Sequence, residues 1–164
     1  MIGELEYRVR RELLLAYMSR DSLGIICAAT LKTRSNDTEY AFRQSSNFLY
    51  LSGIQESDAA LVFAKSGGES RVILFVKELK EQEALWIGST IGVARAKKSF
   101  MVDEVCEIGE LESKLRELAV GKRTIYAEFV SPNASSWLGM NKNIESLKDI
   151  SKFIGKIRLV KSES

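Results

Sequence analysis

Histidine does not occur among the 164 residues of this chain. Its absence excludes a Ser-His or Cys-His nucleophile pair and an imidazole ligand for zinc. A metal site built only from carboxylates would need several Asp or Glu residues to converge, whereas the acidic residues here are mostly dispersed among expected helix faces. We therefore do not expect this chain to catalyse hydrolysis by itself or to hold a cofactor.

Cysteine is scarce, and the charged residues show no excess of one sign. The two cysteines, Cys27 and Cys106, have no C-x-x-C spacing, and Cys27 stands in an apolar run where a small buried thiol is expected. The 24 basic residues are balanced by 22 acidic ones, whereas a nucleic-acid-binding surface needs clustered, unopposed basic charge. We therefore expect no nucleic-acid partner.

A long apolar segment is also missing. The N-terminal residues from Glu4 to Arg11 carry charges of both signs, which does not fit a signal peptide. No run approaches the roughly 20 apolar residues of a membrane-spanning helix. Together with the small number of cysteines, these features predict a cytoplasmic protein with no membrane partner.

The residues that are present have the composition and patterning of one α/β domain. Hydrophobic residues make up 45% of the chain and charged residues 28%, as in ordinary globular domains. Helical spacing alternates with short apolar runs along the chain, which predicts a mixed β-sheet covered by helices. The expected helices cover residues 4–19, 78–86, 94–96, 108–119 and 144–154, and the expected strands cover residues 23–29, 59–64, 71–76, 101–108 and 122–129.

Two smaller features complete the expected elements. Residues 65–69, which contain Gly67 and Gly68, predict the loop of an antiparallel hairpin. Gly121 is expected to close the helix that precedes it.

Residues 34–53 form the most distinctive sequence block of the chain. They read RSNDTEYAFRQSSNFLYLSG. Aromatic residues favour a strand over residues 48–51, with Gly53 ending it. The whole run resembles the N-terminal domain of the Xaa-Pro aminopeptidase (aminopeptidase P) family, whose pattern is approximately R-S-N-D-x-x-Y-x-(F/Y)-R-Q-x-S-x-F-x-Y-x-(S/T)-G. Asn47 departs from the pattern, since an acid is common at that place. Residues 86–92, WIGSTIG, resemble a second block of the family, W-x-G-x-x-x-G.

The resemblance implies a sheet of about six strands with a ribonuclease-H-like architecture. It assigns residues 1–160 to an aminopeptidase P-like N-terminal domain, and residues 161–164 to the start of a linker into a C-terminal metallopeptidase domain outside this chain. In the family that second domain holds two divalent metal ions, usually manganese, through two Asp, one His and two Glu. The implied partners are this C-terminal domain, further copies in a dimer or tetramer, and a peptide substrate with proline at its second position.

The resemblance also suggests roles for individual residues. Trp86 is expected to help form the wall of a neighbouring subunit's substrate pocket, because an indole is a large, stiff apolar surface. Its helical spacing with Leu79 and Gln82 leaves core packing as the alternative. The other motif residues are expected to be mainly structural, and they are Arg34, Tyr40, Arg43, Tyr50, Gly53, Gly88 and Gly92.

Two other functions remain open from the sequence. One is the N-terminal domain of a prolidase or of a creatinase-like hydrolase, which share this architecture. The other is a stand-alone module that binds a peptide or protein without turnover. Residues of a catalytic domain, which these 164 do not include, would decide between these alternatives and the aminopeptidase.

Overall fold

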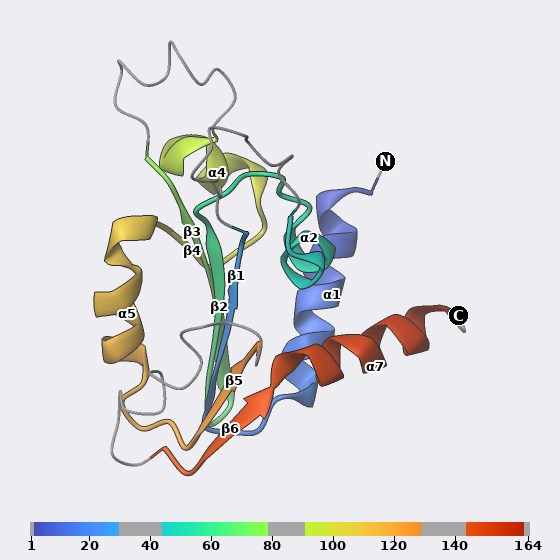
Figure 1. The fold of residues 1–164 in the computed structure, drawn as a ribbon, viewed down its shortest axis with the longest axis vertical. Helices are drawn as coiled ribbons and strands as arrows, with labels where there is room; N and C mark the ends of the chain where they lie inside the picture. Colours follow the sequence, from blue (N-terminus) through green and yellow to red (C-terminus); the bar gives the residue numbers. More distant parts are fainter. Residues whose placement is uncertain (1, 30–43, 79–90, 129–143, 163–164) are drawn as a thin grey trace, which may run out of the picture.

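The computed structural model describes residues 2–29, 44–78, 91–128 and 144–162. Its helices and strands are interspersed along the chain, with β2 followed directly by β3 (Figure 1). In chain order they are α1 (Glu4–Tyr17), β1 (Ser22–Cys27), α2 (Ser46–Ser52), β2 (Ala60–Ser66), β3 (Glu69–Val76), α4 (Gly92–Ser99), β4 (Glu104–Glu107), the 3-10 turn η1 (Ile108–Glu110), α5 (Leu111–Leu118), β5 (Thr124–Ala127), β6 (Ser146–Asp149) and α7 (Ile150–Ser162).

The strands form a six-stranded sheet in the order β4-β3-β2-β1-β5-β6. β2 pairs antiparallel with both β1 and β3, and the remaining neighbours pair in parallel. β2 therefore runs in the direction opposite to that of the other five strands. The predicted mixed sheet of about six strands, flanked by helices, is confirmed.

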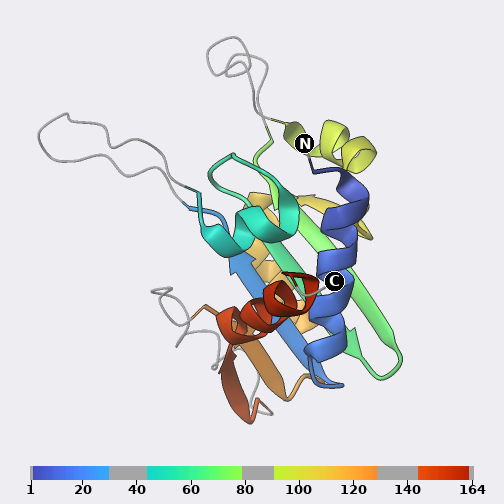
Figure 2. The ribbon, with the colours of Figure 1, turned by 90° about the vertical axis from the view of Figure 1, so that its right-hand side faces the viewer.

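Helices cover both faces of the sheet, with α1, α2 and α7 on one side and α5 on the other (Figures 1 and 2). Strand side chains alternate between the faces, so Phe63 packs with the α1 side while Val62 packs with the α5 side. Because both faces are covered, the central strands β1 and β2 are buried over most of their length, which explains why they read as continuous apolar runs. Ala60–Ala64 is such a run.

The predicted hairpin is confirmed, with a shorter loop than expected. β2 and β3 stay paired as far as Ser66 and Glu69, so the loop consists of Gly67 and Gly68 alone. Gly67 has a φ of 58°, a conformation that favours glycine in two-residue turns.

Residues 48–51 form part of helix α2, so the expected strand there was wrong. The Ser45 side chain accepts a hydrogen bond from the backbone N–H of Phe48 and caps the helix. Phe48 and Leu51 are both buried, because helical spacing places residues three apart on the same face. Gly53 ends the helix in a left-handed conformation, with a φ of 74°.

The last predicted helix begins later than expected, because part of it is a strand. β6 lies at the edge of the sheet and pairs in parallel with β5, with Leu147 opposite Ile125. α7 then begins at Ile150, and the Asp149 carboxylate accepts a hydrogen bond from the N–H of Ser151 at 3.1 Å. Asp149 therefore caps the helix, a signal that residue spacing alone did not reveal.

The remaining described elements agree with the sequence-based expectations, apart from small shifts at their ends. Gly121 adopts a φ of 80° just after α5. Of the expected strand over residues 101–108, only Glu104–Glu107 forms a strand, β4. The domain boundary at residue 160 stays a prediction, and α7 ends at Ser162. Within the described ranges, no helix is long and apolar enough to cross a membrane.

Candidate functional site

The sequence blocks that carry the predicted site residues attach to one edge of the sheet. Because all strands except β2 run in the same direction, their carboxyl ends meet there. Residues 30–43 follow β1 in the chain, and residues 79–90 follow β3. In open α/β sheets, ligands bind outside the carboxyl ends of the strands. We call this the carboxyl edge and treat it as the candidate site.

Five of the predicted site residues lie outside the described residues, so their roles stay predictions. They are Arg34, Tyr40, Arg43, Trp86 and Gly88.

Tyr50, Gly53 and Gly92 lie within the described part of the chain, although the structure does not bring them to one point. Tyr50 and Gly53 belong to α2 and its end, whereas Gly92 begins α4.

Tyr50 is held between two arginines from different helices. The guanidinium carbon of Arg10, in α1, lies 4.1 Å from the centre of the Tyr50 ring, and that of Arg158, in α7, lies 4.5 Å from it. Arg10 also donates a hydrogen bond to the Tyr50 carbonyl at 2.9 Å. Stacked guanidinium groups stabilise an aromatic ring through cation–π attraction. Tyr50 thus joins α1, α2 and α7, which fits a structural role.

Gly53 lies directly against a second tyrosine. A Cβ atom built on Gly53 would come within 2.6 Å of the Tyr7 ring, well inside van der Waals contact. Both the left-handed backbone and this close approach require glycine. The motif glycine therefore lets α2 pack closely against α1.

Gly92 begins α4, and two carboxylates bind the backbone on either side of it. Glu56 accepts a hydrogen bond from the Ile91 N–H at 2.6 Å, and Glu78 accepts one from the Val93 N–H at 3.4 Å. Negative side chains are favourable at a helix N-terminus. Burial raises the pKa of Glu56, an effect opposed by the Ile91 hydrogen bond and by the charge of Arg95.

Gln44 is the most connected polar side chain of the described carboxyl edge. Its amide oxygen accepts hydrogen bonds from the N–H groups of Ala29 at 2.8 Å and Ser45 at 3.0 Å. Its amide nitrogen donates to the carbonyls of Ile54 at 3.1 Å and Glu56 at 2.7 Å. Gln44 is only 8% exposed, so it fixes the end of β1 against the chain that leads into β2.

Asn47 and Glu128 form a second polar group at the same edge. The Asn47 amide donates to a Glu128 carboxylate oxygen at 3.2 Å and to the Ser151 hydroxyl at 3.0 Å. Burial raises the pKa of Glu128; the Asn47 hydrogen bond opposes the shift, and the charge of Asp149 adds to it. These contacts join α2 and α7 to the end of β5.

Cys27, at the end of β1, is not poised as a nucleophile. Burial, and secondarily the charge of Glu128, raise the pKa of its thiol to about 11. The thiol is therefore protonated at neutral pH, whereas reactive cysteines have a lowered pKa.

The described residues do not form a metal centre. Among them, no group of three or more His, Cys, Asp or Glu side chains is arranged to hold an ion. The chemistry available at the described carboxyl edge is hydrogen bonding, which positions the two sequence blocks that attach there.

Sequence reasoning missed the roles of Gln44, Glu56 and Glu128. Gln44 stands inside the 34–53 block, but the pattern of that block does not reveal that the side chain is buried with four partners. Glu128 lies inside the expected strand over residues 122–129, whereas the observed strand β5 ends one residue earlier, at Ala127; the sequence pattern therefore did not place this carboxylate at the carboxyl edge.

Known proteins resemble this chain in sequence and in fold. The family model for the aminopeptidase P N-terminal domain matches residues 7–126. The Xaa-Pro aminopeptidase of Escherichia coli strain K12 is 32% identical over 126 residues, which cover 76% of this chain and 29% of the relative. The Xaa-Pro aminopeptidase of Haemophilus influenzae is 28% identical over 162 residues, which cover 96% of this chain and 37% of the relative.

A solved structure gives the same result. The structure of E. coli aminopeptidase P with the inhibitor Pro-Leu superposes with a TM-score of 0.86 and 27% sequence identity, covering 96% of this chain and 39% of that one. This chain thus spans about a third of the length of the curated relatives it matches. Since the family model covers most of its residues, the chain belongs to the aminopeptidase P N-terminal domain family.

Proposed function

We propose that this chain is the non-catalytic N-terminal domain of a metal-dependent Xaa-Pro aminopeptidase, which removes the first residue from peptides with proline in second place. The observation that carries the proposal is the superposition on E. coli aminopeptidase P, which uses nearly all of this chain but 39% of that enzyme. The E. coli and H. influenzae relatives are both named Xaa-Pro aminopeptidases, which favours this enzyme over a prolidase.

The residues of this chain do not fit the metal pair that such an enzyme needs. The sequence has no histidine, and the described residues offer no suitable group of ligands. Metal ions in peptidases supply an activated water and a polarised carbonyl, so we assign that chemistry to a domain outside these residues. No catalytic step is assigned to the described residues.

The role proposed for this domain is to shape access to the active site and to contribute oligomer contacts. Trp86 belongs to the segment that joins β3 to α4, and this segment leaves the sheet at the carboxyl edge. Glu56 and Glu78 fix the backbone where α4 begins. In the proposal, this anchored segment presents Trp86 to the substrate pocket of a neighbouring subunit.

Two linked experiments test the proposal. The reading frame beyond the codon for Ser164 should continue into a domain that carries two Asp, one His and two Glu as metal ligands. A frame without that ligand set would overturn the proposed activity.

In the full-length protein, Trp86→Ala should lower kcat/KM for an X-Pro peptide by about tenfold. This corresponds to the loss of roughly 1.4 kcal/mol of transition-state stabilisation by the indole ring. Trp86→Phe should retain most of the activity. Tyr17→Ala, which removes an exposed aromatic side chain at the end of α1, serves as the control. Equal effects of the two Ala variants would contradict the role given to Trp86.

A further inference from the structure

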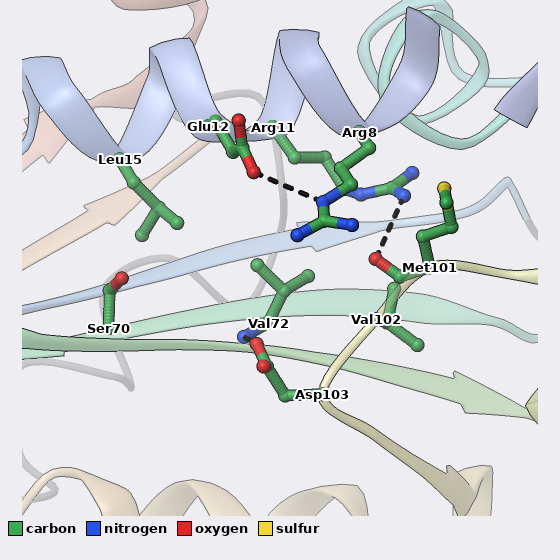
Figure 3. A pocket seen from close by; sticks show the side chains of 9 residues that line it. All are labelled: Arg8, Arg11, Glu12, Leu15, Ser70, Val72, Met101, Val102 and Asp103. Atoms are coloured by element: carbon green, nitrogen blue, oxygen red, sulfur yellow. Dashed lines mark hydrogen bonds and ion pairs between the residues drawn. The ribbon is translucent and has the colours of Figure 1, made fainter. Parts of the chain in front are cut away.

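A pocket of about 390 Å³ lies away from the carboxyl edge. It is bounded by α1, by β3 and by the segment that leads into β4, as Figure 3 shows. Small-molecule pockets in proteins have volumes of about 300–1,000 Å³. The space is therefore sufficient for a small ligand.

The frame of the pocket is fixed by a buried arginine. Arg11 is 2% exposed and donates to the Leu51 carbonyl at 2.8 Å and to the Met101 carbonyl at 3.4 Å. It also pairs with the Glu4 carboxylate, which accepts a hydrogen bond from the Met101 N–H at 3.0 Å. These contacts tie α1 to the segment before β4, so the pocket does not depend on a ligand for its shape.

Two side chains of opposite charge line the pocket from opposite walls. Arg8 projects from α1, and its Nε binds Glu12 at 3.1 Å. Asp103 lies on the other wall, where one carboxylate oxygen accepts a hydrogen bond from the Val72 N–H at 2.7 Å (Figure 3). Among the described residues, the terminal nitrogens of Arg8 and the second carboxylate oxygen of Asp103 have no hydrogen-bond partner.

The remaining lining adds an apolar surface. Leu15, Val72 and Val102 line the pocket together with the charged residues. A purely anionic ligand would meet the carboxylates of Asp103 and Glu12, and a purely cationic one would meet the guanidinium groups of Arg8 and Arg11. A ligand with both charges and an apolar side chain matches the lining best.

We propose that this pocket binds a dipeptide as a zwitterion. The peptide carboxylate binds the free nitrogens of Arg8, because guanidinium groups hold carboxylates in a bidentate way. The peptide ammonium binds Asp103, and an apolar side chain packs on Leu15 and Val72. The Arg8–Glu12 ion pair would oppose binding of the peptide carboxylate to Arg8 only weakly. Both side chains are about half exposed or more, and ion pairs between exposed side chains contribute little free energy.

This site goes beyond the proposed function, and its test does not require a catalytic domain. The 164-residue chain is titrated with the dipeptide Ala-Leu, and binding is followed by NMR of the backbone amides. The amides of Ser70, Val72 and Asp103 should shift, with a dissociation constant of about 1 mM or below. No shift at these amides in this range would overturn the proposal.

Chemical variants of the peptide test the zwitterion directly. N-acetyl-Ala-Leu lacks the ammonium group and Ala-Leu amide lacks the carboxylate, so each should bind about tenfold more weakly, equivalent to the loss of one good polar contact. If both blocked peptides bind as well as Ala-Leu, the proposed recognition is wrong.

Protein variants locate the site. Arg8→Gln and Asp103→Asn should each weaken Ala-Leu binding by about tenfold, and Asn can still accept the Val72 hydrogen bond. The matched control is Arg116→Gln in α5, because Arg116 forms the same kind of i,i+4 pair, with Glu112 at 2.7 Å. Equal weakening by Arg116→Gln, or no weakening by Arg8→Gln, would overturn the assignment.

Discussion

Gly53 illustrates how a single residue sets the packing of two helices. Its left-handed backbone and the Tyr7 ring both exclude a side chain. Gly53→Ala should therefore lower the free energy of unfolding by at least about 2 kcal/mol, from the backbone strain and the clash together. Urea unfolding measures the effect.

The hairpin supplies a matched control for that substitution. Gly68 has no atom within 4 Å of a built Cβ and is not among the glycines with positive φ. Gly68→Ala should change the free energy of unfolding by no more than about 1 kcal/mol. Similar losses for the two variants would contradict the role assigned to Gly53.

Gln44 gives a second prediction at the residue scale. Gln44→Met keeps the approximate volume but removes partners from two backbone N–H groups and two carbonyls. Buried polar groups left without partners are costly, so the variant should lose at least about 2 kcal/mol of stability in urea unfolding. Gln55→Met, at an exposed position nearby, should have little effect. A Gln44→Met variant as stable as the parent would refute the bracing role.

At the scale of elements, Tyr50 connects α1, α2 and α7. Tyr50→Leu removes both guanidinium stacks and should lower the free energy of unfolding by about 1–2 kcal/mol. Tyr50→Phe keeps the aromatic ring between Arg10 and Arg158 and should stay within about 0.5 kcal/mol of the parent. If the Phe variant lost as much stability as the Leu variant, the stacking would not be the stabilising contact.

The contact of β5 with α2 and α7 should depend on pH through Glu128. Burial raises the pKa of this carboxyl in the folded chain, so the folded state binds its proton more tightly than the unfolded state. Ionisation therefore lowers stability as the pH rises from about 4, the ordinary range of a glutamate, through the raised pKa.

Glu128→Gln removes this ionisation while keeping an oxygen that can accept the Asn47 hydrogen bond. The variant should be more stable than the parent at neutral pH, and the difference should vanish below the ordinary pKa of glutamate. Urea unfolding across this pH range measures it, with Glu117→Gln at an exposed site as the control. A difference that grows as the pH falls would contradict the sign of the shift.

Element types were predictable from the sequence where one residue pattern dominated. The α1 helix and the β2–β3 hairpin follow from apolar spacing and a glycine pair. Residues 48–51 contain aromatic residues that favour strands, yet they form a helix. The Ser45 cap and the burial of Phe48 and Leu51 on one helical face stabilise that helix. β6 is four residues long, too short for its periodicity to distinguish a strand from the start of α7. Its pairing with β5 is a tertiary contact that local sequence does not contain.

At the scale of the molecule, the six-stranded sheet and its family were predictable because two sequence blocks occur in the right order. The site was less predictable. A structural role for Tyr50 and Gly53 stays a prediction, and the contacts that support it involve Arg10, Arg158 and Tyr7, which are distant in sequence. The role of Trp86 stays a prediction, because the residue lies outside the described part of the chain.

Aminopeptidase activity tests the central claim of this account most directly. The 164-residue chain and the protein made from the full reading frame are assayed on an X-Pro peptide with manganese present. We predict no hydrolysis by the chain alone, and release of the first residue by the longer protein, abolished by a chelator. Hydrolysis by the 164-residue chain itself, or an inactive longer protein that binds manganese, would contradict the account.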